Sequence, residues 1–170
     1  GVIGAGTMGG GISMNFANVG IPVKILEMDQ AALDKGLGIV RKNYEASAWK
    51  GRISSEDVDV RMRLIEGTTN YSDLKDVDLV IEAVFENMDV KKEVFSKLNE
   101  TVSENTILAS NTSYLDIDEI ATVVDNPERV LGMHFFSPAN IMRLLEIIKA
   151  EKTSPAILAT VLKLAKSIKK

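Results

Sequence analysis

The chain has 170 residues, 45% of them hydrophobic, which suffices for one well-packed domain with at most a small appendage. Its net charge is −4, so no attraction to nucleic acid or to an anionic membrane is expected. The absence of cysteine excludes disulfides, thiolate zinc sites and cysteine nucleophiles, and we expect no metal site. Without an apolar run of about 20 residues or a visible signal segment, we expect an intracellular soluble protein with no membrane span.

A glycine-rich turn follows a very short first strand. Gly4, Gly6 and Gly9 fit the pattern G-x-G-x-x-G, with Thr7 and Met8 before the last glycine. The first glycine permits a tight turn, the second lets the backbone approach a pyrophosphate, and the third lets the next helix pack closely on the sheet. The helix N-terminus would add free N–H groups for the anion. Residues 4–9 are therefore the predicted phosphate cradle.

The next segment favours a dinucleotide. A helix with apolar spacing over residues 12–19 ends at a glycine and a proline, and a short strand then leads to Glu27, 18 residues beyond Gly9. At a spacing of about 20, an acidic side chain meets the ribose hydroxyls of a bound adenosine. A carboxylate there would repel the 2′-phosphate of NADP, so NAD is the expected cofactor. The alternative for Glu27 is an ordinary exposed acid, and neighbouring Asp29 is expected to cap the next helix.

Strand-like apolar runs alternate with helical patterns along the rest of the chain, which is typical of a parallel sheet covered by helices. We expect helices near 30–50, 55–64, 90–101 and 116–124 and from Ser154 onward, and strands near 23–26, 65–68, 78–83, 106–110, 130–135 and 144–148. The predicted fold class is α/β: a Rossmann-type, doubly wound, mostly parallel sheet with helices on both faces.

His134 is the only histidine and the natural candidate for a general base. It lies at the end of a predicted strand, on the side of a parallel sheet where ligands bind. If the next strand pairs with it, Glu146 could hold the imidazole in one tautomer. The alternative is a histidine hydrogen-bonded in a core. A carboxylate buried among apolar neighbours is costly unless it is paired, and this favours the pairing.

Two further polar groups follow strands at the same edge. The Ser-Asn-Thr-Ser cluster at 110–113 could orient a hydroxyl or a carbonyl, although a plain turn or a helix cap also explains it. Glu86 and Lys91 follow the strand at 78–83 and could reach the ribose or phosphate of a cofactor. For these two residues, the alternative is an ordinary surface pair.

Five segments form a recognisable set when taken together. They are Gly-Ala-Gly-Thr-Met-Gly at 4–9, Val-Ile-Glu-Ala-Val-Phe-Glu-Asn at 80–87, Ala-Ser-Asn-Thr-Ser at 109–113, Gly-Met-His-Phe-Phe-Ser-Pro-Ala at 132–139 and Leu-Leu-Glu at 144–146. In order and spacing they resemble the NAD-binding domain of L-3-hydroxyacyl-CoA dehydrogenases. The resemblance implies oxidation of (3S)-3-hydroxyacyl-CoA to 3-oxoacyl-CoA with NAD in fatty-acid β-oxidation.

The resemblance also implies roles for single residues. His134 would take the proton of the 3-hydroxyl while a hydride passes to NAD, and Glu146 would orient His134. Ser113 would be a catalytic residue that hydrogen-bonds the substrate oxygen and also lies at the cofactor. Glu86 and Lys91 match family positions that contact NAD.

Three other positions are implied by the same resemblance. Ser137 stands where many single-function members carry a cofactor-contacting asparagine, so its contact would run through water. Together with the Lys50-Gly51-Arg52 stretch, it looks more like the dehydrogenase part of a multifunctional fatty-acid oxidation enzyme. In the family, the region of Lys42 and Lys50 approaches the CoA phosphates of the acyl-CoA substrate. A merely solvated helix face is the alternative for these lysines.

Residues 1–170 are expected to be a NAD-binding domain truncated at both ends. Family members add a helical C-terminal domain that completes the substrate pocket, so the parent protein is expected to be multidomain or dimeric. Its compartment would be the cytoplasm of a bacterium or archaeon, or a peroxisome or mitochondrion. Two alternatives stay open: a NAD-binding module without turnover in isolation, and a related dehydrogenase of small hydroxy acids.

Overall fold

A computed structural model describes all residues from 1 to 170 and contains one seven-stranded sheet in the order β3-β2-β1-β4-β5-β6-β7. Every neighbouring pair is parallel except β6 and β7, which are antiparallel. The strands are β1 (Val2–Ile3), β2 (Val23–Leu26), β3 (Ile65–Thr68), β4 (Leu79–Glu82), β5 (Ile107–Ser110), β6 (Val130–Phe135) and β7 (Leu145–Ile148). This is the doubly wound order of a dinucleotide-binding sheet, and the predicted fold class is confirmed.

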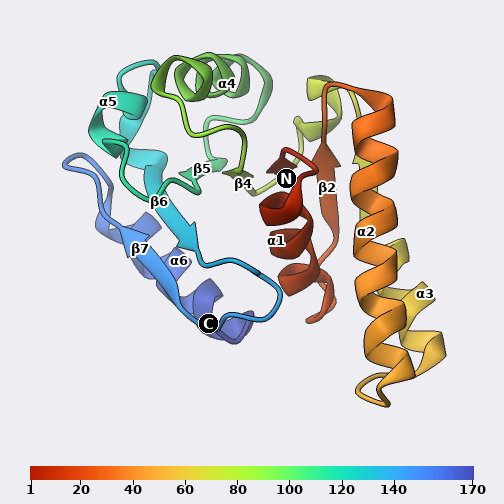
Figure 1. Ribbon diagram of the computed structural model, residues 1–170. Helices are drawn as coiled ribbons and strands as arrows, with labels where there is room; N and C mark the ends of the chain where they lie inside the picture. The colour runs from red at the N-terminus through yellow and green to blue at the C-terminus, as the bar shows by residue number, and fades with distance from the viewer.

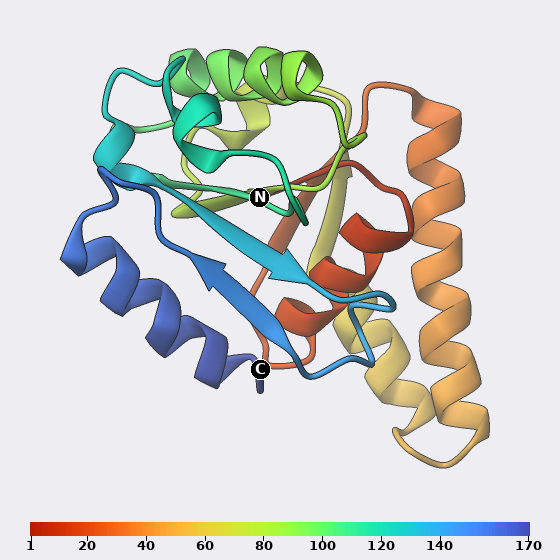
Figure 2. The ribbon, with the colours of Figure 1, turned by 60° about the vertical axis from the view of Figure 1, so that its left-hand side comes forward.

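Helices cover both faces of the sheet (Figures 1 and 2). One face carries α1 (Thr7–Ala17), α2 (Gln30–Trp49), α3 (Ser55–Arg63) and α6 (Pro155–Ser167). The other face carries α4 (Met88–Thr101), α5 (Ile117–Ala121) and the short 3-10 helix η1 (Tyr71–Leu74), and a second one, η2 (Pro127–Arg129), precedes β6. None of the helices combines the length and the hydrophobicity that a membrane-spanning segment requires.

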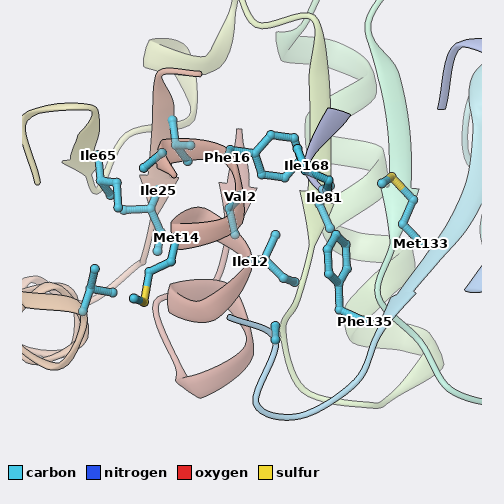
Figure 3. Packing of buried hydrophobic residues seen from close by; sticks show 14 of the residues in the cluster. Val2, Ile12, Met14, Phe16, Ile25, Ile65, Ile81, Met133, Phe135 and Ile168 are labelled. Atoms are coloured by element: carbon cyan, nitrogen blue, oxygen red, sulfur yellow. The ribbon is translucent and has the colours of Figure 1, made fainter. Parts of the chain in front are cut away.

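Alternation along the strands divides the core into two clusters. Val2 and Ile81 face the helix α1, whereas Ile3 and Val80, their neighbours in the chain, face α4. Figure 3 shows the cluster on the α1 side, in which Phe16 packs close to the sheet. Every residue of α1 from Gly9 to Ala17 is buried, so this helix is enclosed on all sides, more completely than its apolar spacing predicts.

The element bounds differ from the predicted ones where a signal is short. The helix α5 ends at Ala121 instead of near 124, and β7 begins at Leu145, one residue later than predicted. The two 3-10 helices were not predicted. Each is only one turn long, and η1 depends on a local contact in which the Asn70 side chain accepts the backbone N–H of Ser72.

The parallel strands place five chain segments together, at the side of the sheet where the carboxyl ends of the strands lie. The glycine turn follows β1, Glu27 follows β2, and Glu86 lies in the loop after β4. The 111–113 loop follows β5, and His134 lies near the end of β6. Because the carboxyl ends of parallel strands meet at the same edge, these segments converge where doubly wound folds bind their ligands.

Candidate functional site

The glycine turn leaves open space over its middle position. Gly4 has a φ of +98°, and a Cβ there would lie 2.8 Å from the carbonyl oxygen of Ala83. A Cβ on Gly9 would overlap the carbonyl oxygen of Gly4, whereas a Cβ on Gly6 would meet nothing within 4 Å. Gly4 and Gly9 are therefore required by the turn itself, and Gly6 faces free space.

The start of α1 suits an anion. Its N-cap is Gly6, no side chain caps the first turn, and no acidic residue lies in that turn. The first backbone N–H groups of a helix have no acceptor within the helix, and they carry the positive end of its dipole. The open space over Gly6 therefore fits a phosphate or a pyrophosphate.

Glu27 joins the end of β2 to the glycine turn. Its Oε2 accepts the N–H of Ala5 at 3.1 Å, and its Oε1 accepts the N–H of Met28 at 2.9 Å. The side chain is half-buried, and each carboxylate oxygen keeps a further lone pair for a ligand hydroxyl. Asp29 caps α2 by accepting the N–H of Ala32 at 2.8 Å, as predicted.

His134 and Glu146 are direct partners across the antiparallel β6–β7 pair, as expected. His134 Nδ1 lies 2.8 Å from Glu146 Oε2, and the Phe136 ring packs against the imidazole at a tilt of 42°, with the two centroids 4.5 Å apart. With an ionised carboxylate as acceptor, Nδ1 carries the hydrogen and Nε2 is left free to accept a proton. The expected burial of Glu146 is wrong: its side chain is 53% exposed on β7, the last strand of the sheet.

Lys91 is fully enclosed, so the alternative of a surface pair with Glu86 is wrong for this residue. Its Nζ donates to Glu82 Oε1 at 2.7 Å and lies 3.7 Å from Glu86 Oε1. Glu82 is also fully buried, and it is not among the functional residues predicted from the sequence. The sequence does contain a sign of this arrangement, because a carboxylate inside the apolar strand β4 requires a buried partner.

The 110–113 loop ties the other parts of the site together. Ser110 donates its hydroxyl to Glu82 at 2.6 Å, and Asn111 accepts the N–H of Phe135, next to His134, at 2.8 Å. Thr112 donates its hydroxyl to Glu86, and Ser113 is exposed. The cluster therefore does more than cap a turn: it links β4, β5 and β6 at the edge where they end.

Three predicted residues lie apart from the contacts described above, which join Glu82, Glu86, the 110–113 loop and the strand that carries His134. Ser137 is exposed in the loop between β6 and β7. Lys42 and Lys50 are exposed on α2 and directly after it. The helix starts near Glu27 and runs away from the glycine turn (Figure 1), so Lys50 lies about 30 Å along the helix from its start. The structure does not bring these lysines to the glycine turn.

Comparison with known proteins decides the family. The model of the family described as "3-hydroxyacyl-CoA dehydrogenase, NAD binding domain" matches residues 1–170. The chain belongs to this family. The residues of this NAD-binding domain fit the cofactor, because the turn opens over Gly6, the start of α1 is uncapped, and the half-buried Glu27 carboxylate lies beside the turn.

Relatives of the domain include single-function and multifunctional enzymes. It is 46% identical to a 3-hydroxybutyryl-CoA dehydrogenase from Clostridioides difficile over 99% of the chain and 60% of that protein. It is 45% identical to a peroxisomal bifunctional enzyme from Cavia porcellus over 100% of the chain and 23% of that protein. The NAD-binding domain thus spans 60% or less of these relatives, and the two identities favour neither kind of parent protein.

Solved structures agree with this assignment. The (S)-3-hydroxybutyryl-CoA dehydrogenase from Ralstonia eutropha superposes with a TM-score of 0.97 at 38% identity, covering 99% of this domain and 60% of that chain. The dehydrogenase part of multifunctional enzyme 1 from C. elegans gives a TM-score of 0.89 at 32% identity, covering 99% of the domain and 39% of that chain. Both likenesses extend over nearly the whole domain.

Proposed function

We propose that this NAD-binding domain belongs to an enzyme that oxidises (3S)-3-hydroxyacyl-CoA to 3-oxoacyl-CoA in fatty-acid β-oxidation. The observation that carries the proposal is the hydrogen-bonded pair of His134 and Glu146 at the sheet edge where the dinucleotide turn also lies. An imidazole with a free Nε2 and a carboxylate on Nδ1 suits the removal of a proton from a hydroxyl group.

The cofactor residues divide between the two halves of the dinucleotide. We assign the pyrophosphate to the 4–9 turn and the adenosine ribose to Glu27, whose negative charge disfavours the 2′-phosphate of NADP. We assign Glu86, Ser113 and Ser137 to the nicotinamide half, with Lys91 behind Glu86. When bound, NAD supplies the acceptor for the hydride that leaves the substrate carbon.

The chain's own residues then handle the proton and the substrate oxygen. His134 Nε2 accepts the proton of the 3-hydroxyl, and the Glu146 carboxylate stabilises the imidazolium that forms. Ser113 donates its hydroxyl to the substrate oxygen, which fixes the carbon that loses the hydride. In the reverse direction, the imidazolium returns the proton to the oxygen of the 3-oxo group.

The acyl-CoA substrate extends beyond this site. Lys42 and Lys50 are assigned to the CoA phosphates, since α2 carries these cations without burying them. A further domain of the parent protein would cover the substrate, which fits the larger size of the relatives. On this account residues 1–170 alone bind the dinucleotide but turn over little substrate.

The test compares thioester with free acid. Full-length protein is assayed with NADH and either acetoacetyl-CoA or acetoacetate, and residues 1–170 are assayed in parallel for NADH binding by fluorescence. We expect NADH oxidation with the thioester only, and binding without turnover for residues 1–170. Comparable rates with both substrates would instead indicate a dehydrogenase of small hydroxy acids. Absence of NADH binding would reject the cofactor assignment.

A further inference from the structure

A buried pair of opposite charges lies beneath the candidate cofactor site. The side chains of Glu82 on β4 and Lys91 in the first turn of α4 are both 0% exposed, and Lys91 Nζ lies 2.7 Å from Glu82 Oε1. Removing two charges from water carries a large desolvation cost, and well-packed apolar side chains often stabilise a fold equally well. The pair therefore calls for a role other than stability.

Glu82 is held on both of its carboxylate oxygens. Oε1 accepts Lys91 Nζ and the N–H of Val84 at 2.8 Å, while Oε2 accepts the Ser110 hydroxyl at 2.6 Å. Glu82 and Ser110 are register partners on β4 and β5. The carboxylate is thus fixed between two strands and the start of α4, and it has no freedom to follow Lys91.

Lys91 also faces a second carboxylate that is open to solvent. Its Nζ lies 3.7 Å from Glu86 Oε1, and the Glu86 side chain is 30% exposed. Glu86 accepts the Thr112 hydroxyl on Oε1 and the N–H of Ser113 on Oε2 at 3.4 Å. One ammonium group therefore stands between an enclosed carboxylate in close contact and an open carboxylate at longer range.

We propose that Glu82 is a positioning residue of the cofactor site and acts through Lys91 on Glu86. By taking the short contact with Lys91, Glu82 leaves the Glu86 carboxylate at the surface, where it accepts a ribose hydroxyl of the nicotinamide half. Without the charge of Glu82, the enclosed ammonium has Glu86 as its only carboxylate partner and draws it inward, away from the ligand. This proposal rests on the assignment of Glu86 to the cofactor.

The test is a double-mutant cycle on NADH affinity in the full-length protein, measured by fluorescence titration. Glu82→Gln is expected to weaken NADH about tenfold, the effect of one lost hydrogen bond to a charged group. In a Glu86→Gln background the same substitution should change Kd by less than about twofold, because the group on which it acts has lost its charge. Lys97→Met is the matched control, since it removes an exposed 2.7 Å ion pair with Glu93 from the same helix.

Glu82→Asp keeps a carboxylate beside Lys91 and should bind NADH within about threefold of wild type, because the ammonium retains a charged partner other than Glu86. This conservative variant also covers the case in which Glu82→Gln fails to fold, since it leaves no unpaired charge in the core. A Glu82→Asp variant that folds but binds NADH about tenfold or more weakly than wild type would overturn the proposal. The proposal would also be overturned if Glu82→Gln lowered NADH affinity equally in the wild-type and the Glu86→Gln backgrounds. If Glu86→Gln alone leaves Kd unchanged, the cofactor assignment of Glu86 fails instead.

Discussion

His134 and Glu146 lie opposite each other on antiparallel strands, with Nδ1 of the imidazole 2.8 Å from Oε2 of the carboxylate. Strand register, not loop conformation, holds them together, so the orientation of the imidazole is built into the sheet. Phe136 packs against the same ring. An imidazole held in this way needs no rearrangement of the backbone to act as the proposed base.

Glu146→Gln should lower kcat with acetoacetyl-CoA by about 100-fold or more, because the amide no longer stabilises the imidazolium. The Glu146 side chain is 53% exposed, so we expect no large change in thermal stability or in Kd for NADH. Glu151→Gln, at an exposed position in the turn after β7, serves as the control. A kcat within about threefold of wild type would rule out the orienting role.

Two alanine substitutions in the glycine turn should have different effects, one on the stability of the protein and the other on NADH binding. Gly9→Ala should destabilise the protein, because its Cβ would overlap the Gly4 carbonyl oxygen. Gly6→Ala should leave the melting temperature near that of wild type but abolish measurable NADH binding, because its Cβ would occupy the space open to the pyrophosphate. Gly38→Ala, in an open position on α2, should stabilise the fold by about 0.5–1 kcal/mol without affecting binding. Normal NADH affinity in Gly6→Ala would contradict the cradle.

Glu27→Ala should lower the affinity for NAD about tenfold or more, because the ribose hydroxyls would lose a charged acceptor. Calorimetry measures this affinity. The same change should narrow the preference for NAD over NADP, since the repulsion of the 2′-phosphate disappears. Glu45→Gln removes a charge from an exposed position on α2 and should change neither affinity. An unaltered affinity for NAD in Glu27→Ala would refute the ribose role.

Lys50→Ala and Lys42→Ala should raise KM for acetoacetyl-CoA a few-fold while kcat stays constant, because the proposed contacts with the CoA phosphates would contribute to substrate binding only. The effect should shrink at high ionic strength. Lys35→Ala, on the same helix and nearer its start, is the comparison variant. If KM does not change in either variant, the lysines form an ordinary solvated face.

The fold was predictable because its signals are local and repeated. The glycine turn, apolar strands such as 107–110 and helical spacing such as that of Leu33 and Val40 each point to one element. Their alternation leaves few possible topologies. The contact of His134 with Glu146 was also predictable, because two adjacent strands joined by a short loop pair antiparallel.

Other features depend on contacts between distant segments. Lys91 follows a loop and reads as a surface residue, yet the fold places it under Glu82 of the neighbouring strand. Glu146 sits in an apolar run and reads as buried, but β7 is the edge strand and its face stays open. Burial at such positions depends on which other elements pack over the residue. The hydrophobic pattern of one strand does not contain that information.

The turnover of His134→Gln in the full-length protein, assayed with acetoacetyl-CoA and NADH, tests the proposed reaction at its proton-transfer step. We predict that kcat falls by about 100- to 10,000-fold, the contribution of a positioned general base, while Kd for NADH stays within about twofold of wild type. Turnover retained within about tenfold of wild type would contradict the assignment of His134 as the base, and with it the proposed reaction.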